Sequence, residues 1–383
     1  MKSYFIFASD ERSYLDLINI VKELKKRGLP YYFLFTKSQE RLIPTHFINE
    51  YNYDTNIKSN QSHFYQTLSI DLPFKPDYVI ISNENWEPEK TIAYEFKTKG
   101  SFVAGVETSS YTFTDLKTKL EIASRKSFPT NCVDVFFDHC DWSKQTKEIS
   151  GWYKNKSVVV GNPKYDDIIV KDIPEENIII IFGAKLDKAH YLLMDRINNE
   201  IIPQFKGYKI YYKPHPCEMR EFSSSFESNK IKNTDIEIIT NHDEFILLLN
   251  KSKYVISYFT SLLYYPLIFN KKIIIFDNIL KNLSINSLTS DFNETDFNFW
   301  KQILKFNTFE DFQHFFTNKF VETINKRNKK INNDLKKYLI PYSTSIDLDI
   351  SSNNKSILKY FDKFGDQKSS SRIVDYLENN LVL

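Results

Sequence analysis

Four short stretches of this sequence place polar side chains directly after apolar runs, where a parallel sheet presents groups to a ligand. The first is Lys213-Pro214-His215-Pro216. Proline fixes φ and removes a backbone donor, so the imidazole of His215 would be held rigidly beside the Lys213 ammonium. Such a pair can donate hydrogen bonds to phosphate oxygens. The alternative is a turn that happens to contain a histidine.

Hydroxyl groups form the second stretch, Thr260-Ser261, which follows the apolar run at 254–256. Where a strand turns into a helix, hydroxyls and backbone N–H groups bind anions, because the helix N-terminus carries partial positive charge. These residues would then bind phosphate. Ser and Thr are also ordinary N-cap residues, so the motif by itself leaves both interpretations open.

The third stretch is Gly183, which follows the apolar run at 178–182 and would let a ligand approach the backbone closely. It lacks the GxGxxG spacing of dinucleotide-binding proteins and the GxxxxGK[ST] spacing of P-loops. NAD-dependent enzymes and P-loop ATPases are therefore disfavoured.

Carboxylates make up the fourth group, after the apolar runs of the N-terminal half. Asp10 follows the first run, Glu87 follows a later one, and Glu107 comes directly after 102–106. A general base must lie within hydrogen-bond reach of the proton it removes, which a carboxylate at a strand end can do. Glu107 is the preferred base because it directly ends an apolar strand, although most surface carboxylates are simply solvated.

Hydrophobic periodicity predicts the elements that position these side chains. The run at 4–8 predicts a strand, the apolar residues recurring every three positions over 15–24 predict a helix that ends near Gly28, and 31–35 predicts a second strand. Such a β-α-β unit builds a parallel sheet. Further strands are predicted at 78–81, 102–106, 132–137 and 157–160, with a helix at 88–99.

A second series of α/β units follows. Strands are predicted at 178–182, 208–212, 236–239, 254–256 and 272–277, and helices at 190–202, 243–250 and 369–383. Runs such as IIIIF do not alternate, so they suit strands covered on both faces. The sequence therefore predicts an α/β protein with two Rossmann-like, doubly wound parallel-sheet domains facing a central cleft. Their predicted bounds are 1–165 and 166–306, and 307–383 is predicted to be a helical extension packing back on them.

Composition narrows the functional classes. With 51 Lys+Arg against 49 Asp+Glu, the chain of 383 residues lacks the basic excess of a nucleic-acid-binding protein. Its cysteines, Cys132, Cys140 and Cys217, show no CxxC spacing, so neither a disulfide framework nor a zinc site is predicted. No apolar stretch reaches about 18 residues. We therefore expect a cytoplasmic protein. An aromatic run at 309–316 and lysines at 326–337 allow peripheral contact with the inner face of a membrane. Core packing also explains the aromatic run, and a solvated helix face also explains the lysines.

The motifs GNPKYD (161–166), KPHP (213–216) and SYFTSLLYYPLIFNKKIIIFD (257–277), in that order, resemble the second half of GT-B glycosyltransferases. The likeness is to the group with cytidine-nucleotide donors: bacterial sialyl- and polysialyltransferases, capsule Kdo transferases, and CDP-glycerol and CDP-ribitol polymerases. It covers residues 157–277, and the closing FGDQKSSSRIVDYL resembles the C-terminal helix of such enzymes. The first half matches in architecture alone.

The resemblance implies a GT-B fold, with an acceptor domain followed by a nucleotide-donor domain. It implies that His215, Pro216, Thr260 and Ser261 hold the donor nucleotide, with His215 stabilising the leaving phosphate, and that no metal or separate cofactor is needed. Lys213 and Gly183 would assist in binding. The sequence departs from the group at Glu107-Thr108, where sialyltransferases have two acids and a glycine and the polymerases tend to have a His-Gly pair.

The expected activity is transfer of a residue from a CMP- or CDP-activated donor to a glycan or lipid-linked acceptor, in synthesis of a bacterial surface polysaccharide such as capsule. An enzyme like UDP-N-acetylglucosamine 2-epimerase, or a UDP-sugar-dependent GT-B enzyme, is one alternative, and nucleotide preference separates it from the first. A non-catalytic glycan-binding protein is another. That alternative predicts that Glu107, Glu87 and Asp10 can each be replaced without loss of function.

Overall fold

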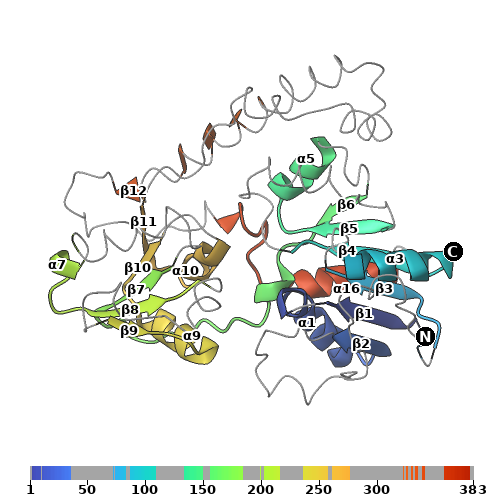
Figure 1. Cartoon of the computed structure of the whole chain (residues 1–383), viewed down its shortest axis with the longest axis horizontal. Helices are drawn as coiled ribbons and strands as arrows, with labels where there is room; N and C mark the ends of the chain where they lie inside the picture. Colours follow the sequence, from blue (N-terminus) through green and yellow to red (C-terminus); the bar gives the residue numbers. More distant parts are fainter. Residues whose placement is uncertain are drawn as a thin grey trace. The chain divides into compact units, whose positions relative to one another are not determined.

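The chain forms two compact units in this computed structural model (Figure 1). Unit 1 contains Met1–Ile168, Leu283–Ile324 and Lys359–Leu383, and unit 2 contains Ile169–Asn282 and Asn325–Leu358. The structure describes residues 2–9, 11–35, 72, 74–82, 87–108, 133–149, 156–183, 199, 202–215, 236–257, 261–276, 322, 325–326, 329–330, 333–334, 339–340 and 358–379.

Unit 1 is built on a parallel sheet of six strands in the order β2-β1-β3-β4-β5-β6. Successive strands pair in register, for example Tyr4 of β1 opposite Tyr31 of β2 and Tyr78 of β3. The strands are β1 (Tyr4–Ala8), β2 (Tyr31–Phe35), β3 (Tyr78–Ile81), β4 (Phe102–Val106), β5 (Val135–Asp138) and β6 (Ser157–Val159).

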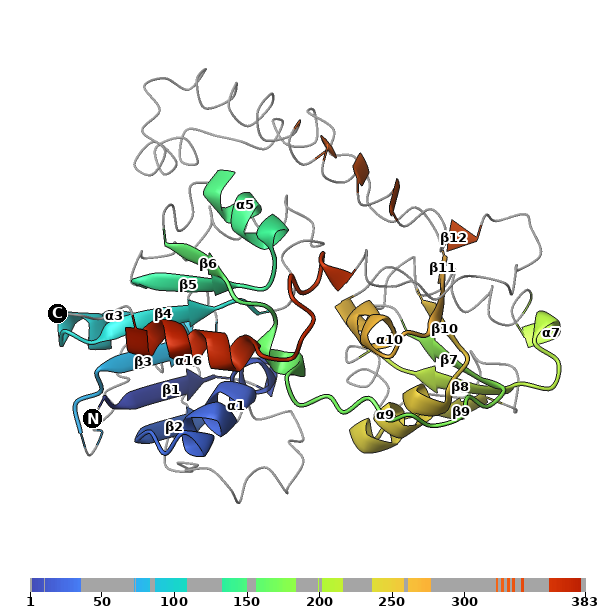
Figure 2. The ribbon, with the colours of Figure 1, turned by 180° about the vertical axis from the view of Figure 1, so that it is seen from behind.

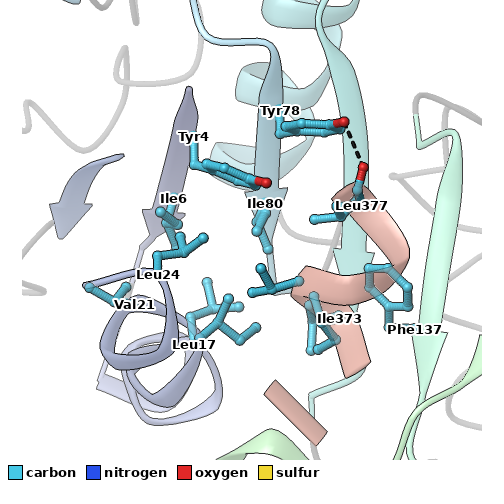
Figure 3. Packing of buried hydrophobic residues seen from close by; sticks show 14 of the residues in the cluster. Tyr4, Ile6, Leu17, Val21, Leu24, Tyr78, Ile80, Phe137, Ile373 and Leu377 are labelled. Carbon is cyan, nitrogen blue, oxygen red and sulfur yellow. Dashed lines mark hydrogen bonds between the residues drawn. The ribbon is translucent and has the colours of Figure 1, made fainter. Parts of the chain in front are cut away.

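Helices cover both faces of this sheet. Helix α1 (Glu11–Lys26) and the C-terminal helix α16 (Ser369–Asn379) lie side by side on one face, as Figure 2 shows. Their apolar residues pack with every second residue of the strands in one buried cluster (Figure 3). On the opposite face, Phe96 of α3 (Glu87–Thr98) contacts Phe5 of β1, with ring centroids 5.0 Å apart. The sheet is therefore buried on both sides, as expected for the predicted doubly wound sheet.

Helix α16 belongs to the core of unit 1 although it follows unit 2 in the sequence. Ile373, Val374 and Leu377 are buried in the cluster, and the Tyr78 hydroxyl donates a hydrogen bond of 2.6 Å to the Leu377 carbonyl. The sequence predicted a helix over 369–383, and the structure confirms a helix over Ser369–Asn379. Figure 3 shows Tyr78 and Leu377 meeting where α16 crosses the strands.

Unit 2 is built on a second parallel sheet, in the order β12-β11-β10-β7-β8-β9. Helix α9 (His242–Lys251) packs on β7, and Phe182 contacts Phe245 at a centroid distance of 5.7 Å. The strands are β7 (Ile178–Phe182), β8 (Lys209–Lys213), β9 (Ile236–Ile238), β10 (Tyr254–Ser257), β11 (Lys272–Phe276) and β12 (Leu339–Ile340).

Two doubly wound parallel sheets confirm the predicted fold class. Strands β1, β2, β3, β4 and β7 have the predicted bounds, and β5, β6, β8, β9, β10 and β11 differ from theirs by one to three residues at one or both ends. The two-residue strand β12 escaped sequence analysis because two apolar residues carry no periodicity. Of the predicted domain bounds, residue 165 lies in the segment that connects the units and residue 306 lies outside the described residues, so this division stays a prediction. In the described residues, no helix is long and apolar enough to cross a membrane.

Candidate functional site

The winding of the unit 2 sheet reverses between β7 and β10. From β7 the chain adds β8 and β9 on one side, then returns to add β10, β11 and β12 on the other. In open α/β sheets, ligands bind beyond the carboxyl ends of the strands at such a reversal, because the two outgoing loops separate there and leave a crevice. The ends of β7, β8 and β10 are thus the first place to look for a ligand site.

The sequence-predicted residues of unit 2 follow these three adjacent strands. Gly183 follows β7, and its N–H donates a 2.8 Å hydrogen bond to the carbonyl of Lys213, the last residue of β8. His215 comes two residues later and is half-buried. Ser261 begins the short 3-10 helix η4 (Ser261–Leu263) after β10, whereas Pro216 and Thr260 lie outside the described residues. The structure thus gathers the described candidates at one sheet edge, and their binding roles stay predictions.

Lys213 is the best-defined cation at this edge. Burial lowers the pKa of its ammonium group below the ordinary value for lysine, and the nearby Glu244 opposes this shift. The Lys213 Nζ atom lies 5.7 Å from the centroid of the Phe245 ring. A partly desolvated cation against an aromatic face interacts more strongly with an anion than an exposed lysine does, because less water screens it.

An aromatic cluster beside Lys213 was missed by sequence analysis. The ring of Phe245 lies 5.3 Å from that of Tyr265 in α10 (Tyr264–Ile268), and the exposed His242 ring lies 6.2 Å from both. His242 starts α9, directly after Asn241, whose side chain accepts hydrogen bonds from Asp243 N and Glu244 N. The rule of searching just after each strand could have found His242, because it lies shortly after β9.

In unit 1, Glu107 lies at the carboxyl end of β4 and is completely buried. Its Oε2 accepts a 2.8 Å hydrogen bond from His139 N, and its Oε1 accepts one of 2.8 Å from the Ser143 hydroxyl. The Nδ1 atom of His139 lies 3.6 Å from the same Oε2. Glu107 therefore holds the turn between β5 and α5 (Asp141–Ile149). His139 was not predicted, since its position next to Glu107 depends on the pairing of β4 with β5.

A second buried carboxylate, Glu89, lies where the winding of the unit 1 sheet reverses, between β1 and β3. Its Oε1 accepts hydrogen bonds from Ser9 N and Oγ and from Ser13 Oγ. Sequence analysis named Asp10 and Glu87 as candidate carboxylates and did not name Glu89. Asp10 lies outside the described residues, as does the side chain of Glu87.

This arrangement has two chemical parts. In unit 2, Lys213, the half-buried His215 and Gly183 lie at the ends of adjacent strands, whereas unit 1 has buried carboxylates that hold the loops after its strands. Within the described ranges, no group of three or more His, Cys, Asp or Glu residues could hold a metal ion. Cys140 is buried and its Sγ donates to the Tyr360 carbonyl, and Cys132 and Cys217 lie outside those ranges.

No family model matches this sequence, and no curated protein matches it. Several solved structures, however, are similar to this chain. The chain is similar to S. aureus MnaA in complex with UDP, at 16% identity and a TM-score of 0.58 over 99% of this chain and 96% of that one. It is also similar to the UDP-GlcNAc 2-epimerase from Neisseria meningitidis bound to UDP-GlcNAc, at 14% identity and a TM-score of 0.56 over 99% and 100% of the two chains.

A third similar structure is the UDP-GlcNAc 2-epimerase from Methanocaldococcus jannaschii in complex with UDP-GlcNAc and UDP. Its identity is 14% and its TM-score 0.55, over 99% of both chains. At such identities the likeness shows the fold, and the GT-B fold predicted from the sequence is confirmed. The three structures contain uridine nucleotides, so they do not support the narrower likeness to the group with cytidine-nucleotide donors.

Proposed function

We propose that this protein is an enzyme that binds a UDP-sugar on unit 2 and acts on its sugar, as the UDP-GlcNAc 2-epimerases or UDP-sugar-dependent GT-B enzymes do. The observation that carries this proposal is the match along 99% of the chain to structures that contain UDP or UDP-GlcNAc. The ligand class of those structures is taken as the hypothesis for this chain, and the experiments below test it.

The edge of the unit 2 sheet supports the proposal because its chemistry suits a diphosphate. The Lys213 ammonium supplies charge, the imidazole of His215 supplies a donor, and Gly183 allows a phosphate oxygen to approach the backbone. Epimerisation through loss of UDP and transfer of the sugar both leave negative charge on the diphosphate. Donors placed in advance stabilise that charge as the bond breaks.

Glu107 remains the proposed base of unit 1. Its carboxylate is fully buried and both of its oxygens accept hydrogen bonds, so proton abstraction requires the turn of His139 and Ser143 to open. When the His139 N–H and the Ser143 hydroxyl no longer donate to it, a buried carboxylate becomes a stronger base, because its charged form then has neither water nor hydrogen bonds to stabilise it.

A transferase with a CMP- or CDP-activated donor and a glycan or lipid-linked acceptor is the second candidate. The order of the KPHP and FTS motifs favours it. A glycan-binding protein without catalysis is the remaining alternative.

Thermal unfolding in the presence of UDP, UDP-GlcNAc, CMP, CDP or GDP tests the ligand class. A nucleotide that binds only the native state raises the midpoint, with about 2.7 kcal/mol of stabilisation at a concentration 100 times Kd. We expect a shift with UDP and UDP-GlcNAc that is reduced in Lys213→Met and His215→Ala. The matched control is Lys209→Met, at the exposed amino end of the same strand, which should keep the shift. A shift with CMP or CDP alone would move the assignment to the second candidate, and no shift with any nucleotide would contradict both.

Product analysis then separates the reaction types. UDP-GlcNAc incubated with the enzyme and no acceptor should give a 2-epimer, detected by proton NMR, if the protein is an epimerase. A UDP-sugar-dependent transferase should release UDP at a substantial rate only when an acceptor is added. Binding without turnover under both conditions supports the non-catalytic alternative.

A further inference from the structure

The segment that leaves unit 1 is held firmly as far as Ile168. The buried Asn19 side chain of α1 donates to the carbonyl oxygens of Pro163 (2.9 Å) and Lys164 (3.3 Å) and to Asp167 Oδ1 (3.1 Å). Pro163 begins the 3-10 helix η2 (Pro163–Tyr165), which lies against α1. The first half of the connection is therefore part of the rigid body of unit 1.

The residues that lead into α16 hold the same segment from the other side. The Asp166 carboxylate accepts hydrogen bonds from Ser369 N (3.1 Å) and Ser370 N, at the start of α16. The Gln367 side chain donates to the carbonyl of Ile168. Gln367 has φ +58°, a left-handed conformation that costs a residue with a Cβ roughly 1 kcal/mol or more. The surrounding contacts impose this conformation, so Ile168 is a fixed end point.

On unit 2, the segment is held again from Lys171 onward. Lys171 N donates a 2.9 Å hydrogen bond to Asn250 Oδ1 near the end of α9. Further along, Glu176 N donates to the Lys251 carbonyl at 2.8 Å, and the Glu175 carboxylate contacts Lys271 Nζ at 3.0 Å. Lys271 is itself buried and donates to the carbonyl of Asn250. Asn250 is thus the first fixed point of the connection on unit 2.

Only Ile169 and Val170 lie between these two fixed points. Their exposed fractions are 67% and 49%, and neither makes a hydrogen bond with any residue that the structure describes. We infer that Ile169-Val170 is the hinge of the outgoing connection, and that Asn250 and Gln367 set its length by clamping the residues on either side. Rotation between the units on this connection is then confined to the backbone dihedrals of this dipeptide.

Two exposed apolar side chains could alternatively serve as a docking surface, but the hydrogen-bond pattern favours the hinge. A docking surface would use only the two side chains. It would not explain why the backbone makes no hydrogen bonds at these two residues while the residues on either side do. The two explanations differ in which variants they tolerate, because alanine removes the side chains and proline removes the backbone freedom.

Hydrogen exchange resolved at single residues tests the clamps without any ligand. The Ile168 N–H donates to the Tyr165 carbonyl at 3.3 Å, and the Lys171 N–H donates to Asn250. We therefore expect these two amides to exchange at least roughly tenfold more slowly than those of Ile169 and Val170, which should exchange at nearly unprotected rates, because hydrogen-bonded amides exchange after local opening. In Asn250→Ala, Lys171 should exchange as fast as Val170. The matched control is Asn241→Ala, which removes the cap at the other end of α9 and should leave Lys171 protected. Equal protection from 168 to 171 in the wild type would overturn the inference.

The hinge itself is tested with two spectroscopic labels introduced as unnatural amino acids. They replace the exposed residues Tyr94 in unit 1 and Leu247 in unit 2, and the width of the distribution of distances between them is measured. The pair Ile169→Pro, Val170→Pro removes no hydrogen bond of a described residue, so it should fold and narrow the distribution. The pair Ile169→Ala, Val170→Ala should leave the width unchanged. An unchanged width in the proline pair, or a changed one in the alanine pair, would refute the hinge. A protein that binds no UDP could still satisfy these expectations, so the outcome is independent of the proposed function.

Discussion

At the scale of single residues, burial decides what each candidate group can do. Lys213 and Glu107 both follow an apolar strand, and sequence patterns treat them alike. Lys213 keeps enough exposure to meet a ligand, whereas Glu107 is completely enclosed by donors from β5 and α5. The same position relative to a strand therefore holds a partly exposed cation in one sheet and a fully buried carboxylate in the other.

The lowered pKa of Lys213 predicts a pH dependence of nucleotide binding. As pH rises, Lys213 loses its proton earlier than an ordinary lysine, so the affinity for UDP should fall on the alkaline side. Lys213→Arg should keep its affinity there, because guanidinium stays charged, and Lys213→Met should lose about 1.5–3 kcal/mol at neutral pH. Isothermal titration calorimetry from pH 7 to 10 measures this. Identical profiles for wild type and Lys213→Arg would show that Lys213 does not contact the diphosphate.

Glu107 variants separate a base from an anchor. Glu107→Gln keeps a carbonyl acceptor for His139 N or Ser143 and should unfold close to the wild-type temperature while losing turnover if the carboxylate is the base. Glu107→Ala should destabilise unit 1 by about 1–3 kcal/mol, because two buried donors lose their acceptor. Urea unfolding and initial rates on UDP-GlcNAc are the measurements. Full turnover in Glu107→Gln would assign Glu107 a structural role alone.

At the scale of elements, α16 is part of the core of unit 1. It supplies Ile373, Val374 and Leu377 to the core, and Arg27 of the segment after α1 pairs with Asp375 and Glu378 on its outer side. The burial of its apolar stripe contributes most of its binding to the sheet, since exposed ion pairs contribute little.

Two substitutions in α16 should lower the free energy of unfolding by very different amounts. Leu377→Ala should lower the stability of unit 1 by about 2–5 kcal/mol, because it leaves a cavity beside Tyr78. Asp375→Ala, on the exposed side of the same helix, should cost less than about 1 kcal/mol. Chemical denaturation followed by circular dichroism measures both. Equal losses would mean that the helix is held by its ion pairs.

Asp166 should give the attachment of α16 a pH dependence. Burial raises its pKa to about 6, although the N–H groups of Ser369 and Ser370 favour the charged form and Asp362 disfavours it. Because the pKa is higher in the folded state than in the unfolded chain, protonated Asp166 contributes to the free energy of unfolding. This contribution is fully present below the unfolded-state pKa near 4 and is lost as pH rises through about 6. Asp166→Asn should lack this slope. Unfolding midpoints of both proteins between pH 4 and 7.5 test this, and parallel curves would contradict the shift.

At the scale of the whole molecule, each unit has its own sheet and core, and the connection at 169–170 is one of the passages of the chain between them. Such units commonly unfold separately. Calorimetry should therefore show two transitions, with Leu377→Ala lowering the one that belongs to unit 1 and UDP raising the one that belongs to unit 2. A single transition that responds to both would mean that the units unfold together.

The sequence by itself determined the class of fold, strands β1 to β11 and helices α1, α3, α9 and α16, whereas α5 and β12 were not predicted. Runs such as 178–182 and the apolar stripe of 373, 374 and 377 act through local periodicity, which any window of the chain displays. The KPHP motif likewise marked the end of β8, because turn chemistry is local.

Only the tertiary structure decided which of these residues meet. The order β10-β7-β8 brings Gly183 and Lys213 together, and the pairing of β4 with β5 encloses Glu107 beside His139. Asp166 caps a helix that begins about 200 residues later. Such contacts depend on strand order and register, which the free energy of the whole packed core determines, so no local pattern could predict them.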